Sequence, residues 1–484
     1  MNEAAQAALP PRRSLFRKPD FARLWTAATV SLFGSQVTQL AIPFIAAVVL
    51  GASPGQVGLL VTVDFLPFLL FTLPAGVWVD RLSRKRILVA ADIGRAVMLA
   101  TIPIAYATGA LTIWQLYVVG FVNGIFTVFF DVADQSYLPT VLERDELVDG
   151  NSKLQISMSA AQILGQPFGG GIVALLTAPI AIAIDAVSFV ASALLIFTIR
   201  RPEAPADGSA AAAASEATSA AEPSTAGVSV AAEAAATATT PAGGGTETGA
   251  LAEPPVKKPG LRAEMTAGLR YIFGNKYLRS IAPTTATSNL FNNIALATFA
   301  VFAYRELGLT PELVGLVGGV GGAGVLIGAL FATRVAERFG VGPAIVWPIL
   351  LGGVAGLLVP LAPAGGAAPY LAAAFFFGGL VNVVYNVNQV SLRQAITPQR
   401  FLGRMNATMR FLVWGTIPIG SLIGAGLSEV VGVRNTVWIG SLLGLLPFLF
   451  VFFSPVRGLH AIPDIDPDTD EDAGSGGAVT AAAA

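Results

Sequence analysis

Long apolar runs separated by short polar breaks recur along most of this chain, and they constrain its fold more than any other feature. Many of them reach about 20 residues, the length that an α-helix needs to cross a bilayer. They predict an all-α membrane protein with about twelve transmembrane helices. We place these spans at 24–50, 54–79, 87–108, 112–137, 147–176, 179–199, 278–304, 311–333, 343–362, 368–394, 402–430 and 434–454.

The composition excludes a soluble protein, because 54% of the residues are hydrophobic and only 12% are charged. Cysteine is absent, which removes disulfides, thiol chemistry and cysteine-based zinc sites. The single histidine, His460, lies beyond the last span, so a proton relay within the membrane has to use carboxylates. No nucleotide-binding loop of the glycine-x4-glycine-lysine-serine/threonine type occurs, which removes the case for ATP-driven transport. We therefore expect no enzyme activity, no cofactor, no bound metal and no nucleic-acid partner.

Lysine and arginine gather on one side of the predicted spans, which indicates the orientation of the chain. They occur in residues 1–20, in the 81–86 loop and from Lys257 to Arg279, whereas the loops around 51–56 and 363–369 carry none. This bias predicts that both termini lie in the cytoplasm and that the chain is a multi-pass protein of the cytoplasmic membrane. The first 20 residues show no small-residue cleavage site, so we expect this segment to be retained.

Two stretches differ from the spans in character. Residues 203–254 are rich in alanine, threonine, glycine, proline and serine, a composition typical of disorder. Residues 258–277 are amphipathic and predict a helix on the inner membrane face. We therefore divide the chain into a cytoplasmic N-terminal segment at 1–20, a six-helix bundle at 21–200, a disordered linker at 201–257, the inner-face helix at 258–277, a second six-helix bundle at 278–456 and a disordered acidic tail at 457–484.

The two halves of the chain repeat each other. Residues 50–59 (LGASPGQVGL) match residues 307–316 (LGLTPELVGL), and each segment places a hydroxyl residue where it can cap a helix that begins with proline. Such a parallel repeat predicts two pseudo-symmetric bundles with a substrate path at their interface. The register pairs Asp80-Arg81 with Glu337-Arg338, and a second constant shift pairs Asn151, Gly165, Gly169 and Gly171 with Asn406, Gly420, Gly424 and Gly426.

The loop after the second predicted span carries a dense motif. Gly76 and Asp80 precede a run of cations, namely Arg81, Arg84, Lys85 and Arg86. The stretch resembles the loop motif of the major facilitator superfamily, glycine-x-x-x-aspartate-arginine-x-x-arginine-lysine, and departs from it at Ser83, where the family usually has glycine. We expect Gly76 to permit close helix approach and Asp80 to accept from free N–H groups at another helix's N-terminus. An ordinary basic stop-transfer loop is the alternative.

Charged residues near the same end of the third and fourth spans extend this motif. Asp92, Arg95, Asp131 and Asp134 could form an ion-paired cluster with Asp80 and the loop cations and close an inner gate. In the family that the motif resembles, this loop is thought to stabilise the outward-open form. The alternative is a set of ordinary interfacial charges.

Asp64 is the clearest ionisable residue within a predicted span, roughly 10 Å from its outer end at 1.5 Å per residue. Such residues are costly in a membrane and are functional candidates, so Asp64 could exchange a proton for substrate. A carboxylate hydrogen-bonded to a neighbouring helix, or facing the outer vestibule, is the alternative. We interpret Asp185, near the outer start of the sixth span, as a helix-end or interfacial residue.

Polar stripes at helical spacing mark helix faces that could line a cavity. They occur in the first, fourth, seventh and tenth spans, which surround the central cavity in the family that the loop motif resembles. Amides also join helices to one another, which is the alternative. The candidates are Ser35, Gln36, Gln39, Asn123, Thr127, Ser288, Asn289, Asn292, Asn293, Asn382, Tyr385, Asn386 and Gln389.

The fifth span resembles the antiporter motif of exporters in this superfamily, glycine-proline-x-x-glycine-glycine. The matching positions are Gly165, Pro167, Gly169 and Gly170, while Gln166 stands where the motif has proline. The segments 114–117 (WQLY) and 134–139 (DQSYLP) are similar to macrolide-efflux proteins and enterobactin exporters. This resemblance implies a major facilitator fold and proton-driven efflux of a moderately large organic molecule. The partners implied are a small-molecule substrate, protons and the lipid bilayer, and we expect a monomer.

Two other functions stay open from the residues. The same fold could work as a proton symporter or uniporter that imports a nutrient. A non-transporting membrane partner of a cytosolic protein is a third possibility.

Overall fold

The computed structural model describes residues 15–79, 81–143, 146–200 and 261–463. All regular elements of these residues are helices, and none of them is a strand. The predicted linker at 201–257 lies outside the described residues, as do most of the N-terminal segment and of the acidic tail.

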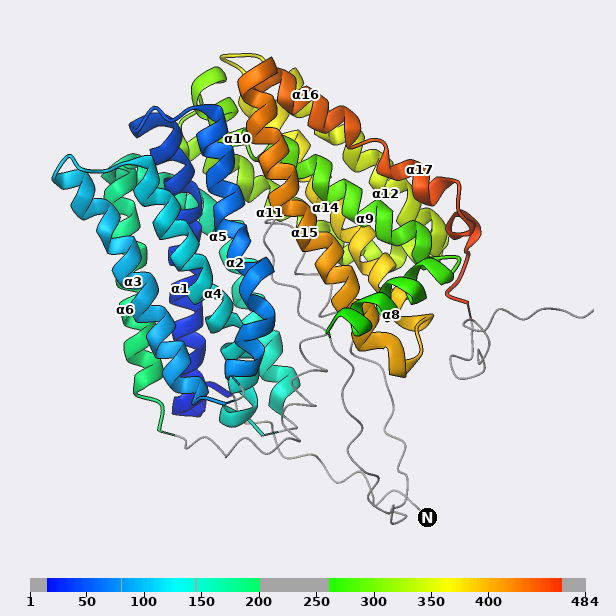
Figure 1. Cartoon of the computed structure of the whole chain (residues 1–484), viewed down its shortest axis with the longest axis horizontal. Coiled ribbons are helices and arrows are strands. Elements are labelled where there is room, and N and C mark those ends of the chain that lie inside the picture. The colour runs from blue at the N-terminus through cyan, green and yellow to red at the C-terminus, as the bar shows by residue number, and fades with distance from the viewer. Residues whose placement is uncertain (1–14, 80, 144–145, 201–260, 464–484) are drawn as a thin grey trace, which may run out of the picture. The chain divides into compact units, whose positions relative to one another are not determined.

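The helix bounds follow the apolar runs closely. In the first half α2 and α5 have the predicted bounds, and α3, α4 and α6 differ from them by a few residues. Figure 1 labels most of these helices along the chain. They are α1 Pro19–Phe44, α2 Pro54–Val79, α3 Arg84–Ala107, α4 Ile113–Val141, α5 Leu147–Leu176, α6 Ala178–Phe197, α8 Leu261–Gly274, α9 Leu278–Leu296, α10 Phe299–Val301, α11 Pro311–Phe339, α12 Val341–Gly356, α13 Leu358–Leu361, α14 Ala367–Ala395, α15 Gln399–Val431, α16 Val433–Leu443 and α17 Pro447–Phe452.

Eleven helical segments in the described part of the chain are long and apolar enough to cross a membrane. The predicted span at 278–304 is not among them. It divides into α9, α10 and a π-helical turn at Phe302–Glu306, and α9 carries many serine, threonine and asparagine residues that lower its hydropathy. The 278–304 segment is therefore compatible with a twelfth span, which would be the most polar of the twelve.

The described helices form two compact units. The first contains α1, α3 to α6, α2 from Val63 onward and residues 310–316. The second contains residues 53–62, α8 to α10, α11 from Val317 onward and α12 to α17. The start of α2 is thus grouped with the second unit and the start of α11 with the first.

The internal repeat is present in the backbone as well as in the sequence. A π-helical turn at Ile45–Val49 follows α1, and its counterpart at Phe302–Glu306 follows α10. Each turn is followed by a glycine with positive φ, +63° at Gly51 and +66° at Gly308, a conformation that favours glycine. The expected cap is also present, because Gln56 N–H donates to Ser53 Oγ at 3.3 Å at the start of α2.

Glycines of α5 and α15 make equivalent close contacts inside their own units. A Cβ at Gly169 would lie 3.1 Å from Val37 Cα of α1, and a Cβ at Gly424 would lie 3.1 Å from Ile294 Cα of α9. Val37 and Ile294 are themselves related by the repeat. Because a side chain at either glycine would crowd backbone atoms, these positions bring helix pairs together in the way that small residues do in membranes.

The segment predicted as an amphipathic helix contains α8, which packs on the second unit, and its place on the inner membrane face stays a prediction. Ile272 is fully buried in the core of that unit. Tyr271 donates from its hydroxyl to the Ile396 carbonyl at 3.2 Å and stacks on Phe401 with ring centroids 5.0 Å apart. Its neighbour Phe273 is 54% exposed. The helix is therefore fixed to the protein through one face.

We predict that Ile272→Ala destabilises the chain by about 2–5 kcal/mol, because it removes a fully buried side chain and leaves a cavity. Phe273→Ala is the matched control, since it truncates the next residue on the exposed face. Thermal denaturation of the full chain in one detergent measures both. Equal effects of the two substitutions would contradict the packing of α8.

Candidate functional site

The basic loop is anchored to α3 and α6. Ser83, where the resembled motif has glycine, is the N-cap of α3 and accepts from Arg86 N–H at 3.4 Å. Lys85 donates from Nζ to the Ile199 carbonyl at 2.7 Å, beyond the C-terminal end of α6, where a cation is favoured. Arg81 and Arg86 are exposed.

Two expectations about the loop motif stay predictions. Asp80 lies outside the described residues, so its expected contact with a helix N-terminus is untested. A Cβ at Gly76 would meet no described atom within 4 Å, so no close helix approach is seen there, whereas glycines such as Gly169 make close approaches within the spans.

Asp92 and Arg95 form an ion pair buried inside the first unit. The Arg95 Nη2 atom contacts Asp92 Oδ1 one turn away on α3, with 7% and 0% of the two side chains exposed. The guanidinium lies between two aromatic rings, with Cζ 4.2 Å from the ring centroids of Phe130 on α4 and Phe189 on α6. Buried charges in membrane proteins are paired in this way.

Asp131 and Asp134 lie on α4 and interact electrostatically with Arg95. Neither has a hydrogen bond or an ion pair to another described residue. The structure therefore brings Asp92, Arg95, Asp131 and Asp134 into one electrostatic group, but it shows only the Asp92–Arg95 pair as a direct contact. No ion pair joins them to the described cations of the 81–86 loop.

Asp64 lies in α2 with its side chain against α4. It follows Pro54 by ten residues, about 15 Å along the helix axis, which is deeper than the sequence estimate. Its carboxylate occupies the space beside Gly120, where a Cβ would overlap Asp64 Oδ1. Among the described residues, Asp64 has no hydrogen-bond or ion-pair partner. The residue is half-buried, and its carboxylate lies against a neighbouring helix without a compensating charge from the described residues.

The interpretation of Asp185 as a helix-end or interfacial residue is wrong. It is 1% exposed in the middle of α6. Its Oδ2 accepts from the Thr38 hydroxyl at 2.5 Å and its Oδ1 from the Ser188 hydroxyl at 3.0 Å. The sequence interpretation used only the distance of Asp185 from the preceding loop. It missed the helical spacing of Asp185, Ser188 and Ser192, which places these polar residues on one helix face.

The predicted cavity residues divide by exposure. Gln39, Asn292 and Asn382 are exposed. Three others are buried inside the second unit and line no open surface there, namely Asn293, Tyr385 and Gln389, which are 4%, 4% and 3% exposed. Of these three, Tyr385 has a side-chain contact that joins two helices, which is the alternative to a cavity role. The remaining candidates are half-buried: Ser35, Gln36, Asn123, Thr127, Ser288, Asn289 and Asn386.

Hydrogen bonds show how these polar residues act. Tyr385 and Thr285 join α14 to α9 through their hydroxyl oxygens, 2.6 Å apart. Asn386 donates to Asn382 Oδ1 at 2.6 Å on the exposed face of α14. In the first unit, Gln36 Oε1 and Asn123 Oδ1 are buried and have no partner among the described residues. Buried acceptors without a protein partner are available to a ligand's donors, and Gln389 Oε1 of the second unit is a further one.

The antiporter-like motif of α5 packs on α1. A Cβ at Gly165 would lie 2.9 Å from Gln36 Cβ, so this glycine brings α5 directly against the polar stripe of α1. Gly169 makes the close approach to Val37, and Pro167 lies inside the helix between them. The motif therefore fixes the position of Gln36.

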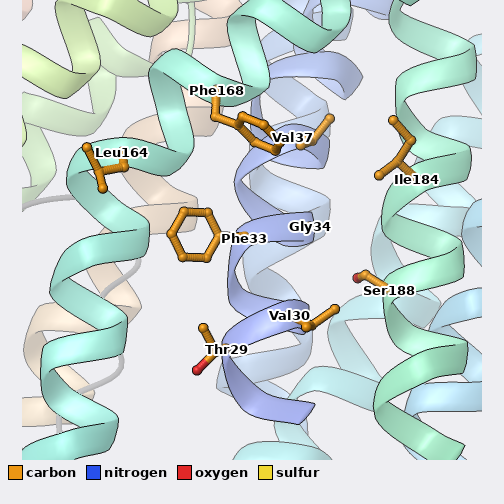
Figure 2. A pocket seen from close by; sticks show the side chains of 9 residues that line it. All are labelled: Thr29, Val30, Phe33, Gly34, Val37, Leu164, Phe168, Ile184 and Ser188. Atoms are coloured by element: carbon orange, nitrogen blue, oxygen red, sulfur yellow. The ribbon is translucent and has the colours of Figure 1, made fainter. Parts of the chain in front are cut away.

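An apolar crevice that sequence reasoning missed lies between α1, α5 and α6. Its volume is about 520 Å³. Figure 2 shows the Phe33 and Phe168 rings at this crevice and the Ser188 hydroxyl directed from α6 toward α1. Its apolar residues have no pattern that distinguishes them from ordinary packing residues. The lining residues are Thr29, Val30, Phe33, Gly34, Val37, Leu164, Phe168, Ile184 and Ser188.

The chemistry available in these groups is the binding of protons and of largely apolar molecules. The described residues contain no group of histidine, cysteine, aspartate or glutamate side chains that could hold a metal ion. The carboxylates at Asp64, Asp131, Asp134 and Asp185 can take up and release protons. Apolar walls with a few polar groups suit an organic ligand.

Comparisons with known proteins agree with this architecture. A model of the Major Facilitator Superfamily matches residues 24–304 and 281–477. The Bacillus subtilis protein named "Uncharacterized MFS-type transporter YfiS" is 30% identical over 178 residues, which are 37% of this chain and 42% of that protein. Macrolide efflux protein A of Streptococcus pyogenes is 26% identical over 186 residues, 38% of this chain and 46% of that protein. The chain thus spans less than half the length of these curated relatives.

Solved structures share the fold across nearly the whole chain. A bacterial homologue of the iron transporter ferroportin, in an inward-facing state, has a TM-score of 0.63 at 16% identity and covers 91% of this chain and 99% of its own. A bacterial homologue of the lysosomal transporter Spinster has a TM-score of 0.60 at 15% identity and covers 91% and 97%. At these identities the likeness shows the fold alone. The helical units, the internal repeat and the match of the family model together show that this chain belongs to the Major Facilitator Superfamily.

Proposed function

We propose that the chain is a secondary active transporter that exports a moderately large, largely apolar organic molecule in exchange for protons. The observation that carries this proposal is Asp64, a half-buried carboxylate within a membrane span that packs against Gly120 and has no partner among the described residues. Intramembrane ionisable groups of this kind mark proton and substrate pathways. The macrolide efflux protein among the relatives supports export and an organic substrate.

Coupling requires that one carboxylate bind a proton in one state and release it in another. Asp64 meets this requirement, because no cation among the described residues pairs with it and its carboxylate packs against Gly120 of a neighbouring helix. A movement of α2 against α4 would change that packing. In alternating access, such a movement links protonation to the opening of the substrate path.

The gate proposal rests on Asp131 and Asp134. Neither has a direct partner among the described residues, and Arg81 and Arg86 of the basic loop are exposed. We propose that Asp80, the loop cations and these acids pair when the inner gate closes. The orientation with both termini in the cytoplasm, the cytoplasmic-membrane location and a monomeric state belong to the same proposal, supported by the distribution of lysine and arginine.

Asp64→Asn should retain substrate binding and lose accumulation driven by a pH gradient, because the amide cannot exchange a proton. Inverted membrane vesicles with a fluorescent macrolide report binding and uptake, and proton flux is followed with a pH-sensitive dye. Opposed proton and substrate fluxes in the wild type support export. Co-directional fluxes would instead favour a symporter, and unchanged accumulation in Asp64→Asn would remove Asp64 from the mechanism.

Gly120→Ala should impair the same coupling, because its methyl group displaces the Asp64 carboxylate. If Gly120 acts only through Asp64, the double variant with Asp64→Asn loses no more accumulation than Asp64→Asn alone. Gly415→Ala is the control, since a Cβ there meets no described atom within 4 Å. Additive losses in the double variant would show that Gly120 acts by another route.

Asp134→Asn should shift the resting population toward the inward-open form, because the inner gate loses an acid that closes it. The chain has no cysteine, so Ser35→Cys introduces a single labelling site on α1. We expect faster labelling by an impermeant maleimide from the cytoplasmic side than in Ser35→Cys alone. Asp149→Asn, which removes an acid paired with Lys153, is the control. Unchanged accessibility from both sides would contradict the gate.

A further inference from the structure

Two buried carboxylates of the first unit share a single arginine. Asp92 on α3 is 0% exposed and pairs with Arg95, while Asp185 on α6 is 1% exposed and interacts electrostatically with the same guanidinium. Phe189, one turn after Asp185 on α6, stacks on Arg95 at 4.2 Å. The arginine therefore lies about one helical turn from Asp185 and beside Asp92.

The charged groups around Asp185 come from few elements. Arg95 and Asp92 of α3 act on it electrostatically without a direct contact, and Asp131 and Asp134 of α4 interact with the same arginine. From α1 and α6 it receives only neutral donors, the hydroxyls of Thr38 and Ser188. None of the described residues of α5 contributes a charge that interacts with it.

The charge balance of this group limits how many of its carboxylates can be ionised. Arg95 already compensates Asp92, so an ionised Asp185 would add an uncompensated negative charge to a buried site, which is strongly unfavourable. A protonated Asp185 avoids that cost. Its hydroxyl neighbours suit either form, because a hydroxyl can both donate and accept.

Three buried polar atoms of this group lack a hydrogen bond of good geometry. They are Asp92 Oδ2, Arg95 Nε and Ser192 Oγ among the described residues, and the Ser192 hydroxyl lies close enough to act on the Asp92 carboxylate. These atoms lie on α3 and α6, the two helices that carry the carboxylates. They offer a second set of contacts for a proton on Asp92 or for a guanidinium that turns toward α6.

We propose that Asp92, Arg95 and Asp185 form a proton-binding site, distinct from Asp64, in which one proton is held between two carboxylates. In this structure the proton is on Asp185, and Arg95 pairs with ionised Asp92. When the proton moves to Asp92, Arg95 pairs with ionised Asp185, and the total charge is unchanged. When the proton leaves to water, the site gains one negative charge. The site depends on neither the substrate nor the direction of transport.

The infrared C=O stretching band of protonated carboxylic acids tests this site in the purified full chain in lipid nanodiscs at neutral pH. Asp185→Asn should remove one component of the band. Asp92→Asn should remove the same component although Asp185 is intact, because the freed arginine then stabilises ionised Asp185. Thr38→Val keeps the acid and should shift that component, since it deletes the hydrogen bond to Oδ2.

Asp149→Asn is the control, because Asp149 is paired with Lys153 at the start of α5 and should leave the band unchanged. A band that is identical in the wild type and Asp185→Asn would overturn the proposal. A component that disappears in Asp185→Asn but persists in Asp92→Asn would overturn the sharing of Arg95. If Asp185→Asn fails to fold, the Thr38→Val shift decides the assignment, and its absence counts against the site. The spectra need neither substrate nor a proton gradient, so they stand apart from the proposed transport activity.

Discussion

Close backbone contact at glycines is the constraint on which the packing of each unit depends. Lipid tails are as apolar as the helices, so burial of apolar surface from water does not hold spans together, and close packing has to do so. Gly169 brings α5 against Val37 of α1, and Gly424 brings α15 against Ile294 of α9. These glycine contacts therefore also determine how the polar groups of α1 and α9 are positioned against α5 and α15. At Gly34 the same device makes room for Ser188 and Asp185.

Sequence patterns predicted the elements of this fold well because they depend on local physics. Apolar length defines a span, and α2 and α5 have the predicted bounds. Proline after a hydroxyl residue defines a helix start, and Ser53 provides the cap of α2. The repeat predicted equivalent positions, and the paired π-helical turns before Gly51 and Gly308 extend that equivalence to the backbone.

The candidate site was less predictable, since it depends on which helix faces which neighbour. Asp185 and Arg95 are 90 positions apart in the sequence, and only the packing of α3 on α6 brings them together. Tyr385 and Gln389 lie on a polar stripe of α14 that predicted a cavity lining, yet both are buried within the second unit. Polarity at helical spacing shows that a face is polar, but not whether another helix covers it.

The two carboxylates differ in what controls their protonation. In the proposed mechanism, Asp64 has no cation among the described residues, so its protonation would follow its packing against Gly120 when α2 moves. Asp185 is buried within its own unit, so in the proposed proton site its protonation would follow the pairing of Arg95. A rearrangement within the first unit can therefore change the protonation of Asp185 without altering the surroundings of Asp64. Coupling between them requires an element with two arrangements that both sites favour differently. The α4 helix is the natural element, because it carries Gly120 beside Asp64 and Phe130 against Arg95.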